Sequence, residues 1–290
     1  MNPNWHDLSF IALSRRISQQ LSGAGIEEAE QETRWLLEKN FGTDVWQKLI
    51  EPEQKPDADA LPELASQVAR RLAGEPLSHI LGNKGFWSLD LQINADVLTP
   101  RADSETLVAV ALRLSQNQPT GRILDLGTGS GAVLLAFLSE RANWHGVGVD
   151  ISAPALQIAN TNAQTNGLAK RSHFIHANWN DLASKPYDLV ISNPPYIASA
   201  EIETLQLEVR AFEPRIALDG GEDGLDAYRS LAKKLPDWLK PGSPFAFEIG
   251  HSQAKTVTEI LQQTAICTEL TTDKDLANRD RVVSGRLCRA

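Results

Sequence analysis

The stretch from Arg122 to Leu138, RILDLGTGSGAVLLAFL, constrains the fold more than any other part of the chain. It predicts a short apolar strand, a turn that contains three glycines, and a helix that begins at Ala132. Glycines suit such a turn because they adopt positive φ and let a ligand approach the backbone closely. The first turn of the helix then presents free N–H groups above the strand. The stretch therefore predicts either a ligand-binding turn or a tight strand-helix connection.

A carboxylate at the end of the next predicted strand favours the first alternative. That strand ends in VGVD at Asp150, about one β-α-β unit after the glycine turn. In folds of this kind an acidic residue at this place binds the two ribose hydroxyls of a nucleotide or nucleoside ligand. The pairing of turn and carboxylate predicts an adenosine-containing ligand.

A second motif follows a later strand. The apolar run from Tyr187 to Ser192 leads into Asn193-Pro194-Pro195-Tyr196. Two consecutive prolines fix the backbone of the turn. The Asn193 side chain and the Pro194 carbonyl can then be held as paired hydrogen-bond acceptors, with the Tyr196 ring nearby. A Pro-Pro strand terminator is the alternative, and the flanking Asn and Tyr favour a site for a planar amino group.

Together, DLGTGSG, Asp150 and NPPY resemble the class I S-adenosylmethionine methyltransferases that act on a planar, conjugated nitrogen. Three further stretches narrow the resemblance to the HemK family of protein-glutamine methyltransferases, which modify peptide chain release factors. They are VLTPRADSE, VRAFEPRIALDGGEDGLDAYR and NRDRVVSGR, at residues 97–105, 209–229 and 278–286. The similarity runs from about Glu75 to the C-terminus, whereas the first seventy residues match only in helical character.

The resemblance implies an activity and a set of site residues. The expected reaction moves a methyl group from S-adenosyl-L-methionine to the side-chain amide nitrogen of the glutamine in a release factor GGQ motif, which supports translation termination and leaves S-adenosyl-L-homocysteine. The residues expected to bind the cofactor are Gly127, Thr128, Gly129, Ser130, Gly131, Asp150, Asn178, Trp179 and Asn193. Those expected to hold the substrate are Asn193, Pro194, Pro195, Tyr196 and Arg101, and Asn193, Pro194 and Tyr196 are the expected catalytic residues.

Asn178 departs from the family pattern, and Trp179 and Arg101 each have an alternative role. Related sequences usually have an acidic residue where Asn178 stands, although the Asn carbonyl oxygen can still accept a hydrogen bond from adenine. Trp179 beside it can flank the adenine ring or belong to the core. Arg101 lies beside the active site by resemblance, or else forms a surface ion pair with Asp103 or Glu105 worth under ~1 kcal/mol.

Composition, charge and residue spacing argue against several kinds of partner and binding site. The 290 residues carry a formal net charge of −9, which argues against nucleic acid as a direct partner. The two cysteines, Cys267 and Cys288, lack the spacing of a disulfide framework or a metal site. His173 and His176 would point to opposite faces of a strand, so we predict no metal. The start, MNPNWHDLSF, resembles no leader, and no apolar run is long enough to span a membrane, which predicts a cytoplasmic protein, expected to be a monomer.

Periodicity predicts two folded parts. Apolar residues recur at helical spacing over residues 8–21, 26–41, 44–50 and 61–72, with stops at Gly42, Pro52 and Gly74. We therefore expect a helical domain over residues 1–84, whose role in substrate docking is implied only by the resemblance. After Gly85 the apolar residues alternate, which predicts a linking strand or hairpin over residues 85–100. It leads to a helix that Asp103 or Ser104 can cap.

Residues 101–290 alternate strand and helix, which predicts an α/β domain with a mainly parallel sheet covered on both faces. Strands are expected at residues 122–126, 145–150, 172–176, 187–192 and 244–249, and a last antiparallel hairpin at 266–271 and 281–287. The resemblance makes this a Rossmann-like class I methyltransferase sheet of seven strands. The segment 198–224 has a weak pattern and is expected to cross near the active site as a lid.

Three other functions remain open at this stage. A ribosomal-protein glutamine methyltransferase would use the same chemistry, and motif residues alone separate it poorly. A nucleic-acid adenine methyltransferase could also use NPPY, but the acidic chain has no Lys/Arg-rich segment for a duplex. A binding protein without catalysis is disfavoured because both the glycine turn and Asn193 are retained.

Overall fold

The computed structural model describes residues 5–51 and 53–288. Pro52, predicted to end the third helix, and the first four residues of the chain lie outside this part. The chain divides into two compact units, one of residues 1–82 with 207–212 and one of residues 83–206 with 213–290. Within the described residues, no helix has the length and apolar character required to cross a bilayer.

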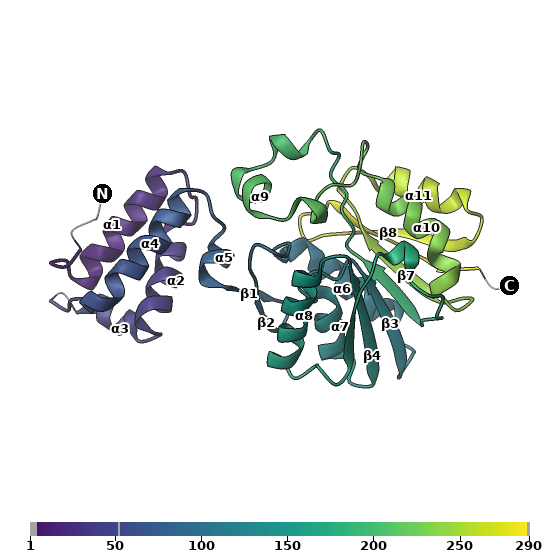
Figure 1. Ribbon diagram of the computed structural model, residues 1–290, viewed down its shortest axis with the longest axis horizontal. Helices are drawn as coiled ribbons and strands as arrows, with labels where there is room; N and C mark the ends of the chain where they lie inside the picture. Colours follow the sequence, from purple (N-terminus) through teal and green to yellow (C-terminus); the bar gives the residue numbers. More distant parts are fainter. Residues whose placement is uncertain (1–4, 52, 289–290) are drawn as a thin grey trace. The chain divides into compact units, whose positions relative to one another are not determined.

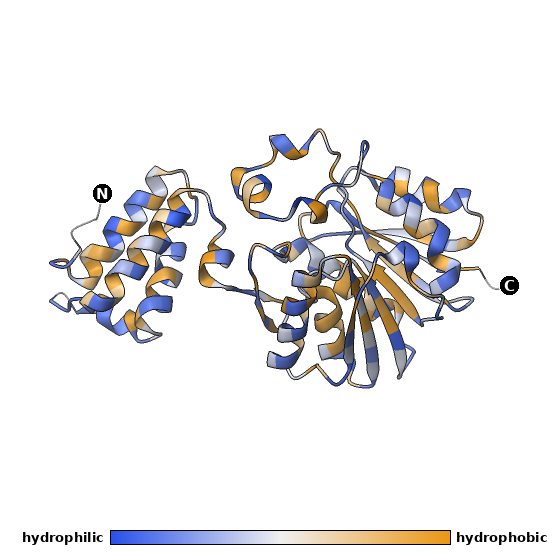
Figure 2. Cartoon of the chain, in the orientation of Figure 1, coloured by the Kyte–Doolittle hydropathy of each residue, from blue (hydrophilic) through white to orange (hydrophobic). Residues whose placement is uncertain are grey.

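The first unit is a helical bundle whose apolar faces meet in one core (Figure 2). Leu13, Ile17 and Leu21 lie on one face of the first helix and are fully buried, as their helical spacing predicts. Gly42 ends the second helix with φ 82°, as expected. The helices are α1 (Phe10–Gly23), α2 (Ala29–Phe41), α3 (Val45–Ile50), α4 (Leu61–Leu72), α5 (Leu77–Leu81) and α9 (Leu207–Phe212).

One short helix of this unit comes from far along the chain. Helix α9 lies between two strands of the other unit in sequence, yet it groups with the bundle. Arg71 on α4 is buried, forms a bidentate ion pair with Glu32 on α2, and also binds Glu208 at 2.7 Å. This unit therefore includes a segment from a distant part of the chain, whereas the sequence predicted one continuous domain.

The second unit is built on a seven-stranded sheet in the order β5-β4-β3-β6-β7-β9-β8. The first five strands are parallel, and β9 and β8 form the antiparallel hairpin predicted for the end of the chain. The sheet strands are β3 (Gly121–Leu126), β4 (Trp144–Asp150), β5 (Ser172–His176), β6 (Leu189–Ser192), β7 (Pro244–Glu248), β8 (Cys267–Lys274) and β9 (Asp280–Leu287). This is the predicted seven-stranded, Rossmann-like arrangement.

Helices cover both faces of this sheet (Figure 1). Side chains along each strand alternate between the two apolar cores: Leu189 and Ile191 join the core on one face, and Val190 joins the core on the other. The first face carries α6 (Glu105–Leu114), α7 (Ala132–Glu140) and α8 (Ala153–Thr165), and the second carries α10 (Asp226–Trp238) and α11 (Ala254–Gln263). A hairpin of β1 (Asn83–Phe86) and β2 (Leu89–Gln92) packs with the first face, so the predicted hairpin is present.

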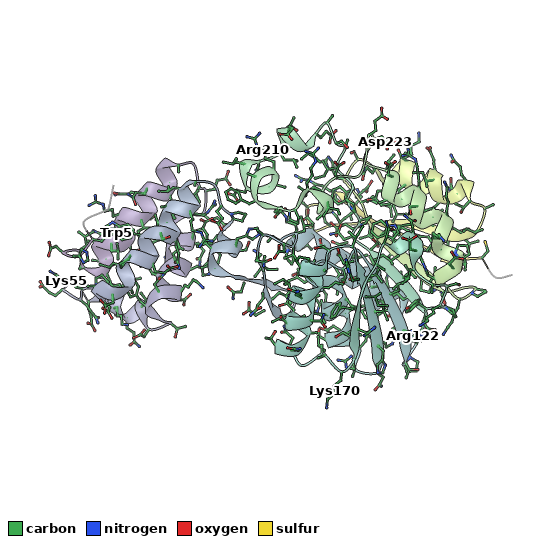
Figure 3. All side chains as sticks on the ribbon, viewed as in Figure 1. Trp5, Lys55, Arg122, Lys170, Arg210 and Asp223 are labelled. Atoms are coloured by element: carbon green, nitrogen blue, oxygen red, sulfur yellow. The ribbon has the colours of Figure 1, made fainter. Side chains whose placement is uncertain are left out.

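The strand order indicates where a ligand should bind. From β3 the chain adds β4 and β5 on one side and then returns to place β6 on the other side of β3. In open α/β sheets ligands bind outside the carboxyl ends of the strands at such a reversal. Arg122 and Lys170, next to the starts of β3 and β5, lie at the opposite edge (Figure 3). The ligand site is therefore expected at the carboxyl ends of β3 and β6.

Candidate active site

The turn after β3 has the conformation that its glycines predict. Gly127, Gly129 and Gly131 have φ of 73°, 53° and 80°, values that residues with a side chain rarely adopt. The Gly127 and Thr128 N–H groups both donate to the Val149 carbonyl, which ties the turn to β4. Helix α7 begins directly after Gly131, so its N-terminus faces the space above the sheet.

Asp150 ends β4 and is fixed by two backbone donors. The Gly129 N–H donates to Oδ2 at 2.8 Å, and the Ser152 N–H donates to Oδ1 at 2.9 Å. A carboxylate has further lone pairs, so Asp150 keeps acceptor capacity for a ligand. Ser152 also caps α8 by accepting from the Ala155 N–H, which holds the loop after β4 in place.

Asp125, within the DLGTGSG motif, is a buried acid that the sequence analysis did not single out. Its side chain is nearly inaccessible and accepts a hydrogen bond from the Thr128 hydroxyl at 2.6 Å. Burial, followed by the nearby charge of Asp150, raises the pKa of the Asp125 carboxyl to about 7. The available signal was a carboxylate within the apolar run from Ile123 to Leu126.

The two residues after β5 flank the same region. Asn178 is exposed, and its side-chain oxygen already accepts from the Asn180 N–H at 2.9 Å. Trp179 is half-buried, and its ring nitrogen donates to Ser230 at 3.2 Å. The Trp179 ring would lie 3.5 Å from a Cβ placed on Gly127, so it faces the glycine turn.

The NPPY turn follows β6 directly. Ser192 donates to the Leu126 carbonyl at 2.6 Å, which fixes the end of β6 against the end of β3. The Asn193 side-chain nitrogen donates to the Ser104 hydroxyl at 3.2 Å. Burial, and then the charge of Glu248, raises the pKa of Tyr196 to about 12, so this phenol stays protonated in the neutral range.

Arg101 has a different partner from those expected. It binds Glu213 through both carboxylate oxygens at 3.0 Å, and not Asp103 or Glu105. Asp103 pairs instead with Arg281 at 2.9 Å. Glu213 lies 112 residues from Arg101, so local sequence could not have indicated this pair. Burial raises the pKa of Glu213 even though Arg101 opposes the shift.

Helix α6 also differs from expectation. Ser104 immediately precedes it, but its side chain makes no capping hydrogen bond. Its hydroxyl instead accepts from the Asn193 side chain, and it also lowers the pKa of the neighbouring Glu248 carboxyl. Glu248 ends β7 inside the apolar run PFAFEIG, and this single acid was a signal that the sequence analysis did not use.

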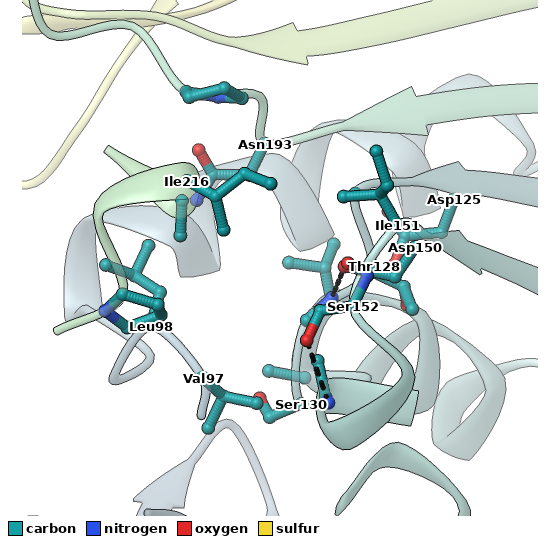
Figure 4. A pocket seen from close by; sticks show the side chains of 18 of the residues that line it. Val97, Leu98, Asp125, Thr128, Ser130, Asp150, Ile151, Ser152, Asn193 and Ile216 are labelled. Carbon is teal, nitrogen blue, oxygen red and sulfur yellow. Dashed lines mark hydrogen bonds between the residues drawn. The ribbon is translucent and has the colours of Figure 1, made fainter. Parts of the chain in front are cut away.

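These elements enclose one cavity of about 300 Å³, seen from close by in Figure 4. Asn193 and Ile216 lie on one side, and Asp150, Ile151 and Ser152 lie across from them. The lining contains the predicted residues Arg101, Gly127, Thr128, Gly129, Ser130, Asp150, Asn178, Trp179, Asn193 and Pro195. The predicted residues Gly131, Pro194 and Tyr196 are not among the described residues that line the cavity. The roles of all the predicted site residues stay predictions.

The segment expected to be a lid contributes only in part. Pro214, Ile216, Ala217 and Asp219 line the cavity, whereas α9 belongs to the helical unit. The predicted role of this segment as a lid over the active site stays a prediction.

The cavity has the chemistry that S-adenosylmethionine requires. Asp150 offers acceptors suited to ribose hydroxyls, and the buried Asp125 offers a carboxylate suited to a cationic ligand. Apolar side chains such as Val97, Val133 and Trp179 complete the walls. Fold and cavity together define a class I S-adenosylmethionine-dependent methyltransferase.

Comparison with known proteins identifies the family within this class of methyltransferases. A Methyltransferase small domain model matches residues 102–212, and a PrmC N-terminal domain model matches residues 12–82. A release factor glutamine methyltransferase from Caulobacter vibrioides is 44% identical over 96% of both chains, and one from Bradyrhizobium diazoefficiens is 41% identical over 96% of this chain and 95% of its own. The chain belongs to the release factor glutamine methyltransferase family.

Solved structures agree on the fold. A methyltransferase from Pyrococcus furiosus matches with a TM-score of 0.51 and 13% identity, covering 77% of this chain and 98% of its own. At that identity the likeness concerns the fold alone.

Proposed function

We propose that this protein methylates the side-chain amide nitrogen of the glutamine in the GGQ motif of a peptide chain release factor. The observation that carries the proposal is that Asn193 lines the same cavity as Asp150 and the glycine turn. This shared lining supports a role for Asn193 in holding an amide substrate next to the cofactor. The names of the relatives supply the substrate class.

In this proposal the NPPY turn orients the substrate amide. One amide N–H donates to Asn193 Oδ1, and the other donates to the Pro194 carbonyl. An amide nitrogen is a poor nucleophile because its lone pair is delocalised into the carbonyl. Holding both N–H groups turns that lone pair toward the methyl donor, and positioning of this kind can supply up to ~7–11 kcal/mol. We assign to Tyr196 packing against the substrate amide.

The cofactor half of the cavity has separate tasks. S-adenosylmethionine supplies an electrophilic methyl group on sulfur and becomes S-adenosylhomocysteine. Asp150 would bind the ribose, the turn from Gly127 to Gly131 would lie along the methionine part, and Trp179 would flank the adenine. Because the Asn178 oxygen already accepts from Asn180, its bond to the adenine amine would be shared and weak.

Arg101 would line the substrate end of the cavity. Its ion pair with the buried Glu213 fixes Pro214 and Ile216 beside it, and these residues are also part of the wall. We therefore assign Arg101 to substrate positioning through this wall.

We assign docking of the protein substrate to the helical unit. A family model specific to this N-terminal domain matches residues 12–82, which supports a role beyond packing. We further propose that the enzyme works as a monomer in the cytoplasm, where translation supplies its substrate, and that it needs neither metal nor nucleic acid.

Mass spectrometry tests the function directly. The protein is incubated with S-adenosylmethionine and a release factor, and the GGQ peptide should gain the mass of one methyl group. A release factor with Gln replaced by Asn in that motif serves as the negative control. Ribosomal proteins and adenine-containing nucleic acid are offered in parallel, and methylation of either in preference to the release factor would contradict the proposal.

A further inference from the structure

Behind Asn193 lies a row of polar side chains that the proposed chemistry does not use. The Asn193 side-chain nitrogen donates to Ser104 Oγ at 3.2 Å, and the Ser104 hydroxyl faces the Glu248 carboxyl and lowers its pKa. Ser104 and Glu248 are 3% and 2% exposed, so water does not compete for these bonds. The three residues come from β6, the start of α6 and the end of β7.

A structural explanation for this arrangement is weak. Ser104 stands where a serine normally caps a helix, yet it makes no such bond. Glu248 Oε2 is buried and has no hydrogen-bond partner within the described part of the chain. A buried carboxyl with an unpaired oxygen destabilises a fold, so these residues cost stability and need another reason to be present.

Hydrogen-bond direction supplies that reason. An ionised carboxylate only accepts, so it takes the single hydrogen of the Ser104 hydroxyl. Ser104 Oγ can then only accept, and the group it accepts from is the Asn193 NH₂. With its nitrogen bound in this way, Asn193 keeps Oδ1 as the atom that can accept from a substrate amide.

We propose that Ser104 and Glu248 are positioning residues that fix the Asn193 carboxamide with Oδ1 available to the substrate. The proposal rests on the role given to Asn193 above. Ser104 also lines the cavity, whereas Glu248 does not, and we assign neither residue a bond to the substrate. They determine whether the oxygen or the nitrogen of the Asn193 carboxamide faces the substrate.

The proposal makes methyl transfer depend on pH. A protonated Glu248 could donate to Ser104 Oγ, and the Ser104 hydrogen could then go to Asn193 Oδ1, which favours the reversed amide. Burial raises the pKa of Glu248 to about 7, while the Ser104 hydrogen bond and Arg281 oppose the rise. The charged and titratable groups facing Glu248 are Arg281, Arg101, Asp103, Tyr196 and Tyr228.

The test is the single-turnover rate from pH 5.5 to 9 with saturating cofactor and release factor. The wild-type rate should rise with pH, reach half of its maximum near the Glu248 pKa of about 7, and level off at higher pH where Glu248 is fully ionised. Glu248→Gln should be slower than the wild-type plateau and lack this rise. Ser104→Ala should be slower by about tenfold, the value of one hydrogen bond, and also lack the rise. Ser104→Thr keeps a hydroxyl and should restore both rate and pH dependence.

Controls separate positioning from general damage. Ser115→Ala removes another buried hydroxyl, bonded to the Ala111 carbonyl, and Asp188→Asn neutralises a buried acid at the other end of β6. Both should keep the wild-type rate and pH profile, and cofactor affinity should stay within about twofold in every variant. Should Ser104→Ala or Glu248→Gln keep the wild-type rate and pH profile while Asn193→Ala is slow, the positioning role alone is wrong. Should Asn193→Ala itself be unaffected, the proposed amide site is wrong.

Discussion

The Gly129 N–H donates to Asp150 Oδ2 at 2.8 Å, so the glycine turn and the acidic end of β4 form one unit. This hydrogen bond orients the Asp150 carboxylate, and it also holds the backbone of the glycine turn in place. The carboxylate that we propose as the ribose ligand is therefore already oriented before a ligand arrives.

Replacing Asp150 should weaken cofactor binding selectively. Asp150→Ala removes at least one charge-assisted hydrogen bond to the ribose, worth roughly 1.5–3 kcal/mol, so affinity should fall by about tenfold to a hundredfold. Isothermal titration calorimetry measures this. Asp181→Ala, an exposed acid near the cavity, is the matched control. An unchanged affinity in Asp150→Ala would argue against the assignment.

Replacing Asn193 should slow chemistry with little structural damage. The residue lies at a strand end and is half-buried, so the Pro-Pro turn should survive. Asn193→Ala should cost on the order of a hundredfold in single-turnover rate, by analogy with a lost oxyanion-hole donor. Asn193→Asp keeps an acceptor and should retain partial activity, while Asn160→Ala on the exposed side of α8 should have no effect. Wild-type rates in Asn193→Ala would make the turn purely structural.

Cofactor affinity should depend on the ionisation of Asp125. In the free protein the pKa of this carboxyl is raised to about 7, and a cationic ligand beside it favours the ionised form. Binding should release a proton near neutral pH, and affinity should increase as pH rises through 7. Calorimetry in two buffers with different ionisation enthalpies counts the proton. Asp125→Asn should bind without proton release, and equal release in both proteins would refute this origin.

Stability without cofactor should change in the opposite direction. A carboxyl whose folded pKa is raised contributes stability that is fully present below its unfolded pKa and is lost as pH rises through about 7. Between pH 4 and 7 the free energy of unfolding should therefore fall more steeply in the wild type than in Asp125→Asn. Urea denaturation at several pH values measures both slopes, which should differ.

Removal of the helical unit should separate binding from protein methylation. A chain of residues 83–290 keeps every residue that lines the cavity, so cofactor affinity should persist. Methylation of the intact release factor should fall strongly because the proposed docking unit is missing. Full activity would contradict the docking role.

A variant of the full chain controls for the helix that the truncation leaves behind. Removing residues 1–82 deprives α9 of Arg71, the partner of Glu208. Glu208→Gln breaks that ion pair with both units present and should reduce methylation far less than the truncation does. Equal losses in the two proteins would indicate that α9, and not docking, accounts for the effect.

Several features could be predicted from the sequence because their signals are local. The glycine turn, the Asp150 strand end and the NPPY turn each lie within a few residues, and their backbone demands are specific to Gly and Pro. Alternation of apolar residues similarly predicted the sheet strands and the final hairpin. These signals were sufficient for the family, the class of fold and most of the cavity lining.

The remaining features depend on residues that only folding brings together. Arg101 meets Glu213 across 112 residues, and Asn193 meets Ser104 across 89. The sequence favoured local partners for Arg101 and a capping role for Ser104, because neighbours along the chain are all that a pattern can compare. Burial decides the rest: the ionisation of Asp125 and Glu248 follows from the loss of water around them, and solvent exclusion is a property of the packed tertiary structure that no stretch of sequence carries by itself.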